Sequence, residues 1–343
     1  MANYAASVLA EAKLILKDRF AEAEKRLKAT GVFGAFRENT DLAIPNIGEL
    51  RTQVNRPEKA YFQNRTKRTN GGARAYNHIG SVGDSSEVAV SYTTFSDKCQ
   101  TSLKRGDNNL FNDAQILANE LENMIKNIYE AADEAALTYL GTNKTEVNVA
   151  TKNGVWDATA NVFEIGTDDI ARFIQAGKSM LRQNYYKGTA DLILDPVLFM
   201  EAEHYLFQGA GNSVNTAYQK AGVELWEALT LTDATYTEGV GYFIPKGTIG
   251  VIDWIPRQNR EGYGDYESVL GGYGSMVDPL SGLTFAIHGY SQRADTQATG
   301  GDTQDVVTEW ELSVDLSFNK APLSVENEST IFEVGIIDAP ANP

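Results

Sequence analysis

The sequence predicts an α+β fold, because one segment has the periodicity of a long helix and another has that of a long strand. From about Asn112 to Leu140, apolar residues recur at spacings of three or four. In the segment 302–320, apolar and polar residues alternate, as in a strand with one buried face. A chain of 343 residues with 42% hydrophobic content can bury a sizeable core and form more than one lobe.

The helical segment is predicted to be the spine of a flat domain. Asn112 or Asp113 can cap its start and Gly141 its end. The helix would then contain about 28 residues and measure roughly 42 Å at 1.5 Å per residue. An earlier helix is expected from Ala5 to about Lys28, and we interpret it as an N-terminal arm.

Residues 51–78 form a basic segment in an acidic chain. They contain seven Lys or Arg residues and one acid, Glu58, whereas the formal net charge of the chain is −16. The turn signal Asn70-Gly71-Gly72 predicts a long β-hairpin, and the scarcity of aliphatic residues predicts that it projects from the body. Such a cluster usually meets negative charge, which leaves nucleic acid and a second copy of the chain as alternatives.

The strand predicted over 302–320 has two unlike faces. Its apolar face is expected to pack against the long helix and comprises Trp310, Leu312, Val314 and Leu316. Its other face is expected to be a ladder of polar and acidic residues, namely Glu309, Glu311, Ser313 and Asp315. From Asp295 to the C-terminus there are ten acids against Lys320 alone, so the sequence also contains a partner surface for the basic hairpin.

The middle of the chain predicts a second group of elements. A helix is expected near 168–184, and a buried strand over 191–194 ends at Asp195-Pro196, where a helix begins. Two β segments flank Pro245-Lys246-Gly247, and the Gly-rich and Tyr-rich segment 262–274 is expected to be an exposed loop. Tyr263, Tyr266 and Tyr273 in that loop could form subunit contacts or simply lie on the surface, and the sequence leaves both open.

Enzyme functions find little support in the sequence. The three histidines lie in unrelated contexts, and the motifs HExxH, GxSxG and GxxxxGK[ST] do not occur. His204 supplies one metal ligand of the three or four required, and Cys99, the only cysteine, cannot form an internal disulfide. We therefore predict no catalytic, cofactor-binding or metal site, and no apolar run is long enough to span a membrane.

The order of these elements resembles the major capsid proteins of tailed bacteriophages, whose Hong Kong 97-type fold is shared by herpesvirus capsid floors. The resemblance covers nearly the whole chain and includes the loose motifs LILDPVLF, residues 192–199, and FIPKGTIGVIDW, residues 243–254. It implies an N-terminal arm over 1–47, an extended β-hairpin loop over 48–97, a peripheral domain with the spine helix over 98–190, an axial domain over 191–295, and return strands with a C-terminal tail over 296–343.

The resemblance also implies a function. The chain would self-assemble into pentamers and hexamers of an icosahedral head that encloses double-stranded DNA, and it would not be an enzyme. Its location would be the virion, after assembly in the host bacterial cytoplasm. A separate scaffolding protein, a portal, decoration proteins and weakly held DNA would be its other partners, without a membrane.

In this family the extended loop lies across a neighbouring subunit, so the resemblance assigns contact residues. The loop would contribute Arg56, Lys59, Arg65, Lys67, Arg68 and Arg74, and the acidic strand face of the neighbour would contribute Glu309, Glu311 and Asp315. Tyr263, Tyr266 and Tyr273 would be candidates for contacts at the centre of a capsomer.

Three alternatives remain from the sequence. An encapsulin-like nanocompartment would assemble in the same way but enclose protein cargo. A nucleic-acid-binding module would use the basic hairpin on phosphate, and its affinity would fall steeply with salt. A hydrolase would need a pocket that converges on His204 or His288.

Overall fold

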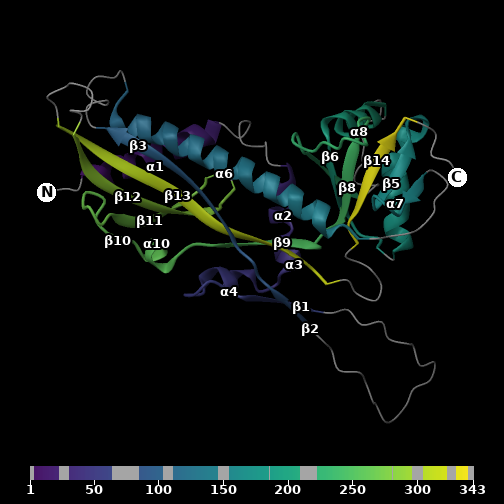
Figure 1. Ribbon diagram of the computed structural model, residues 1–343, viewed down its shortest axis with the longest axis horizontal. Coiled ribbons are helices and arrows are strands. Elements are labelled where there is room, and N and C mark those ends of the chain that lie inside the picture. Colours follow the sequence, from purple (N-terminus) through teal and green to yellow (C-terminus); the bar gives the residue numbers. More distant parts are fainter. Residues whose placement is uncertain are drawn as a thin grey trace, which may run out of the picture.

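The computed structural model describes residues 4–22, 31–63, 85–102, 111–145, 154–184, 186–208, 222–279, 281–295, 304–322 and 330–338. Helices and strands are combined in an elongated molecule that has a six-stranded sheet towards each end, and a long helix, α6, lies along the first sheet and ends near the second (Figure 1). This arrangement confirms the predicted α+β class. Among the residues described, no helix is long and apolar enough to cross a membrane.

The first sheet is built around one long strand, β13 (Gln304–Lys320). The strand order is β10-β11-β12-β13-β3, and β9 also pairs with β13. The other members are β3 (Thr93–Ser102), β9 (Ile249–Trp254), β10 (Tyr263–Gly264), β11 (Gly272–Val277) and β12 (Thr284–Asp295). The predicted strand over 302–320 is therefore confirmed, and it lies at the centre of the sheet.

The apolar face of β13 is the one that the sequence predicts. Trp310, Leu312, Val314 and Leu316 are at most 2% exposed and share one apolar core with α6. Alternation along a strand puts these side chains on one face, and burial of that face stabilises the sheet against the helix.

Helix α6 (Asp113–Asn143) is the predicted spine. Its start has a capping box, in which the Asn112 side chain accepts from the Gln115 N–H and the Gln115 side chain accepts from the Asn112 N–H. The helix continues past Gly141, the predicted end. Lys320 Nζ donates to the Asn143 carbonyl oxygen at 2.7 Å, so a cation from β13 satisfies the helix C-terminus.

The N-terminal segment forms helix α1 (Tyr4–Glu22), which packs on α6 through Ala5, Leu9, Ala12 and Leu16. The expected continuation of this helix to Lys28 lies outside the described residues. Three short helices follow, α2 (Gly31–Glu38), α3 (Thr40–Ala43) and α4 (Ile47–Thr52). The first of these begins close to β7, where a Cβ at Gly31 would lie 1.8 Å from the Glu227 carbonyl oxygen, so only glycine fits there.

The second sheet has the order β4-β5-β14-β8-β6-β7 and mixes parallel with antiparallel pairs. Its strands are β4 (Val155–Asp157), β5 (Val162–Gly166), β6 (Ala190–Leu194), β7 (Val223–Glu227), β8 (Val240–Pro245) and β14 (Phe332–Ile337). Helices α7 (Phe173–Gln183) and α8 (Pro196–Gln208) pack with it (Figure 1). The predicted strand–Asp-Pro–helix unit is present, and Asp195 Oδ1 accepts from the Leu198 N–H at the start of α8.

Each sheet contains strands from both sides of residue 191, where a domain boundary is expected, and the domain boundaries themselves stay a prediction. Strands β4 and β5 and helix α7 precede residue 191 but belong to the second sheet, whereas β9 to β12 follow it and belong to the first. Strands β8 and β9 are separated only by residues 246–248 and still lie in different sheets. Sheet membership depends on which strands pair in the folded chain, and no local pattern reveals this.

The base of the predicted hairpin is present as the strand pair β1 (Lys59–Gln63) and β2 (Ser85–Ala89). The pair is antiparallel, with register Lys59↔Ala89 to Gln63↔Ser85, and Val90 N–H donates to the Glu58 carbonyl oxygen. Figure 1 shows both strands on the far side of α4 and β9 from the long helix. The predicted turn at Asn70-Gly71-Gly72 lies outside the described residues.

Candidate functional site

The basic segment is partly neutralised within its own chain. Arg51 Nε lies 2.6 Å from Asp253 Oδ1, Arg56 Nη2 lies 2.7 Å from Asp315 Oδ2, and Lys59 Nζ lies 2.6 Å from Glu87 Oε1. Arg65, Lys67, Arg68 and Arg74 lie outside the described residues. Of the seven cations in the segment, these four are the ones whose pairing within the chain is not defined.

Arg56 and Asp315 were predicted to contact neighbouring subunits, and the structure pairs them with each other. Asp315 is 5% exposed and accepts a further hydrogen bond from the Thr94 hydroxyl. The Arg56 guanidinium also lies over the rings of Tyr92 and Trp254, with Cζ at 5.4 and 5.6 Å from the centroids. The prediction that Asp315 lies on an exposed acidic face is therefore wrong. The residues at the base of the hairpin, Arg56 with β1, β2 and Tyr92, which we call the hairpin root, cover this end of β13.

Glu309 and Glu311 are half-buried on the same face of β13. Tyr290 OH donates to a Glu309 carboxylate oxygen, and Lys98 Nζ lies 3.5 Å from Glu311 Oε2. The Lys98 side chain is 71% exposed, so this second pair is weak and can be displaced. The predicted acidic ladder is thus largely satisfied within the chain, and Glu311 is the member with the loosest partner.

Carboxylates that the sequence analysis did not single out lie on the exposed side of α6. Glu130 and Glu134, one helical turn apart, are exposed, and neither has an ion-pair partner among the described residues. A groove of about 450 Å³ between α6 and β3 is lined by Asp97, Glu120 and Glu130, together with Lys98 and Lys126. The signal for the helical part of this surface was in the sequence, because Glu120, Glu130 and Glu134 fall on the polar side of α6.

The three predicted tyrosines lie on the first sheet and not on the second. Tyr266 packs on Trp310, with ring centroids 5.4 Å apart, and Tyr273 packs on His288 at 4.6 Å. Tyr263, on the edge strand β10, is 74% exposed. The segment 262–274 is therefore a short hairpin at the sheet edge, β10–β11, and only Tyr263 of the three remains widely accessible.

The tip of this hairpin carries two apolar residues that the sequence analysis did not single out. Val269 is 83% exposed and Leu270 is 87% exposed. Exposed aliphatic side chains at a projecting turn are a common feature of protein contact surfaces.

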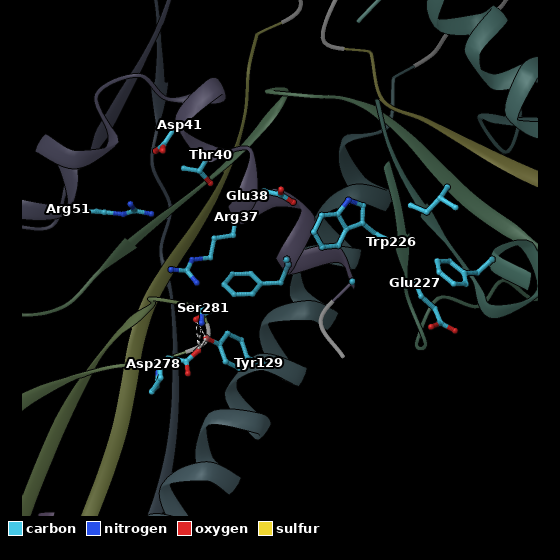
Figure 2. A pocket seen from close by; sticks show the side chains of 16 residues that line it. Arg37, Glu38, Thr40, Asp41, Arg51, Tyr129, Trp226, Glu227, Asp278 and Ser281 are labelled. Atoms are coloured by element: carbon cyan, nitrogen blue, oxygen red, sulfur yellow. Dashed lines mark hydrogen bonds between the residues drawn. The ribbon is translucent and has the colours of Figure 1, made fainter. Parts of the chain in front are cut away.

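A pocket of about 1010 Å³ lies where α2 and α6 approach β7 and the turn 278–281 (Figure 2). Tyr129 OH donates to Asp278 Oδ2 at 2.6 Å, and the Ser281 N–H donates to the same oxygen at 3.0 Å. Figure 2 shows Arg37 reaching toward this turn and Trp226 on the opposite wall. Burial lowers the pKa of Arg37. The pocket is also lined by acids, among them Asp41 and Asp278. The hydrogen bonds from Tyr129 and Ser281 to Asp278 hold the turn in place.

The described residues contain no group of three or more His, Cys, Asp or Glu side chains that could hold a metal ion. Burial raises the pKa of Cys99 to about 12, so this thiol is a poor nucleophile at neutral pH. His204 lies on α8, which packs with the second sheet, and His288 lies in the middle of β12 in the first sheet, so the two histidines do not converge.

No family model matches the sequence, and no curated protein matches it. Among solved structures, the chain is similar to one from Mycobacterium phage Che8, with 10% identity, a TM-score of 0.42, and coverage of 86% of this chain and 89% of that one. It is also similar to a chain of the capsid of cyanophage P-SCSP1u, with 13% identity, a TM-score of 0.42, and coverage of 84% and 86%. A chain of the mature capsid of bacteriophage PhiM1 has 14% identity, a TM-score of 0.38, and coverage of 83% and 84%.

Proposed function

We propose that this protein is a structural protein, the major capsid protein of a tailed bacteriophage. Copies assemble into pentamers and hexamers of an icosahedral head that encloses double-stranded DNA. One observation carries the proposal: a basic hairpin is fixed by its root to an acidic body. The segment 51–78 has a net charge of +6, which leaves −22 for the rest of the chain.

The hairpin root is attached to the body of its own chain, which supports a contact between the more distal cations of the hairpin and a neighbouring copy. Ala60 and Phe62 of β1 pack into a small apolar cluster with Ile44, Ile47 and Ile252. Arg51 and Arg56 are paired with carboxylates of the body. The cations at 65, 67, 68 and 74 lie further along the hairpin sequence, where they can meet an acidic surface of the next copy. A contact between unlike patches is heterologous, and such contacts close into rings.

The acidic surface that fits this role best is the exposed side of α6 in the neighbouring copy. Glu130 and Glu134 are exposed there, whereas Asp315 is buried beneath Arg56. Each exposed ion pair contributes at most about 1 kcal/mol, so the strength of the contact comes from repetition around every ring. Glu309 and Glu311 are secondary candidates, since each already has a partner in its own chain.

The other parts of the proposal follow from the same assignment. The protein resides in the virion and assembles in the host bacterial cytoplasm, with a separate scaffolding protein, a portal and decoration proteins as partners. Packaged DNA is held by weak, non-specific contact, because an acidic body repels phosphate. An encapsulin-like shell is the alternative with the same assembly, and protein cargo in place of a genome distinguishes it.

Reversal of the hairpin charges tests the proposal. The variant Arg65→Glu/Lys67→Glu/Arg68→Glu should remain folded but should not assemble, because it sets like charges against the acids of the neighbour. Negative-stain microscopy and light scattering report shells, and the thermal midpoint reports folding. A matched control reverses three exposed cations elsewhere, Lys17, Arg172 and Arg257, and should assemble despite the same change in net charge.

Addition of Glu130→Lys and Glu134→Lys to the hairpin variant should restore part of the assembly. High salt should weaken the wild-type contact and relieve the repulsion in the hairpin variant. If the hairpin variant assembles normally but loses affinity for duplex DNA, the cations face nucleic acid and the protein is a binding module.

A further inference from the structure

Besides the apolar cluster that holds β1 to Ile44, Ile47 and Ile252, one polar side chain, Arg56, contacts both the hairpin and the body. This residue precedes β1, and Tyr92, whose ring lies under the guanidinium, is in the link between β2 and β3. Trp254, at the end of β9, provides a second ring under the same guanidinium. Arg56 therefore contacts the chain that enters the hairpin, the chain that leaves it, and the sheet.

Asp315, the ion partner of Arg56, is at the point where three strands come together. In β13 it is paired with Thr94 of β3 on one side and with Trp254 of β9 on the other. One carboxylate oxygen accepts from the Thr94 hydroxyl and the other lies 2.7 Å from Arg56 Nη2. A carboxylate that is 5% exposed needs its cation, so the pair holds the hairpin root to the most central strand of the sheet.

The chain just before Arg56 is fixed by other contacts. Arg260 donates to the carbonyl oxygens of Arg51 and Gln53, at 3.1 and 2.6 Å, and the Trp254 indole N–H donates to Gln53 at 3.2 Å. Arg51 itself pairs with Asp253. The peptide segment that leads into the hairpin is consequently attached to β9 and to α10 (Arg257–Glu261) before it reaches Arg56.

We propose that Arg56 is a positioning residue, which fixes the direction in which the hairpin leaves the body, and not a contact to a neighbouring subunit. Lys59 makes a useful contrast. Its partner Glu87 is on β2, so this exposed pair links one hairpin strand to the other and moves with the hairpin. Arg56 alone of these two cations links the hairpin to the sheet.

The test measures the direction of the hairpin in the full-length monomer. Spin labels are attached at Tyr61→Cys on β1 and Ala131→Cys on α6, two exposed positions, in a Cys99→Ala background. Pulsed electron paramagnetic resonance then gives the distribution of distances between the labels. Arg56→Gln and Asp315→Asn should each replace one narrow peak by a broad distribution, Arg56→Lys should be intermediate because it keeps the charge without the planar fork, and Lys59→Gln should leave the peak unchanged.

Two results would overturn the proposal. One is a narrow, unshifted peak in Arg56→Gln. The other is a lower thermal midpoint in Arg56→Gln with an unchanged distance distribution, which would mean that Arg56 contributes stability without setting direction.

The consequence for assembly rests on the proposed function and is measured separately. If wild type forms shells, Arg56→Gln should give fewer closed shells and more irregular aggregates, and normal shells from a variant with a broadened distance distribution would refute the link between direction and assembly. Failure of wild type to assemble with or without scaffold would overturn the capsid assignment, whereas the distance measurement on the monomer would still decide the role of Arg56.

Discussion

At the scale of single residues, Asp191 on β6 is a carboxylate buried where the second sheet meets α2 and α3. It is 4% exposed, its Oδ2 accepts from Asn39 Nδ2 at 2.7 Å, and its Oδ1 lies 4.0 Å from Lys246 Nζ. Lys246 is shared with Glu224, which pairs with it more closely. Burial raises the pKa of Asp191 to about 7, and the attraction of Lys246 offsets only part of that rise.

This raised pKa predicts a pH dependence of stability. The contribution of Asp191 is fully present below its unfolded pKa of 3.8 and is lost as the pH rises through about 7, because the folded state favours the protonated acid. Relative to Asp191→Asn, the free energy of unfolding of wild type should therefore fall by up to about 1.4 kcal/mol for each pH unit in that range. Urea denaturation of both proteins from pH 4 to pH 8 measures the difference, and a difference independent of pH would contradict the prediction.

The sequence predicted the apolar residues of the core better than it predicted the charged residues of the site. Leu312 follows from alternation, which is a local signal. The Arg56–Asp315 pair joins residues 259 positions apart, and each residue alone resembles an ordinary exposed charge. The sequence shows that a basic segment stands against an acidic remainder of the chain. Which of these charges form ion pairs depends on their distances in the folded protein.

At the scale of the element, β13 was predicted within two residues of its observed start because its pattern repeats over its whole length. Its neighbours could not be predicted in the same way. Strands β3 and β9 come from distant parts of the sequence, although β12 directly precedes β13. Strands β8 and β9 are adjacent in the sequence and have similar patterns, yet they join different sheets. Sheet membership could not be predicted from local patterns, whereas the spine helix and the strand–Asp-Pro–helix unit, both local, were predicted correctly.

The central position of β13 predicts the cost of a core truncation. Leu312 is fully buried between α6 and the sheet, so Leu312→Ala should lower the free energy of unfolding by about 2 to 5 kcal/mol. Val306→Ala, on the same strand but 43% exposed, is the matched control and should change it by no more than about 0.5 kcal/mol. Chemical denaturation compares the two variants, and equal losses would remove Leu312 from the core.

At the scale of the whole molecule, two separate surfaces beside the first sheet differ in what they offer to another copy. The first sheet ends in the β10–β11 hairpin, whose tip exposes Val269 and Leu270. The root of the basic hairpin lies instead beside β9 and α4, where the chain passes toward the second sheet (Figure 1). Because these two surfaces lie apart, substitutions at one of them can remove its contacts with another copy while the contacts of the other surface are kept.

The apolar tip predicts a second contribution to self-association. Val269→Ser/Leu270→Ser should leave the thermal midpoint unchanged, because both side chains are already in solvent, and should reduce self-association in sedimentation velocity. Leu229→Ser, at a residue that is 60% exposed beyond β7, is the control and should have little effect. Unaltered sedimentation of the double variant would show that the tip is not a contact.

The central place of β13 also bears on how the polypeptide is made. Strand β3 ends at Ser102, yet the strand that pairs with it runs from Gln304 to Lys320. A ribosome must therefore synthesise more than 200 further residues before β3 gains that neighbour. Until then α6 can pack on α1 and β3 but lacks the rest of the sheet that covers it, a condition in which nascent chains aggregate or are held by chaperones. Newly translated chains should consequently depend on chaperones until β13 has been synthesised, even though each sheet is stable once it is complete.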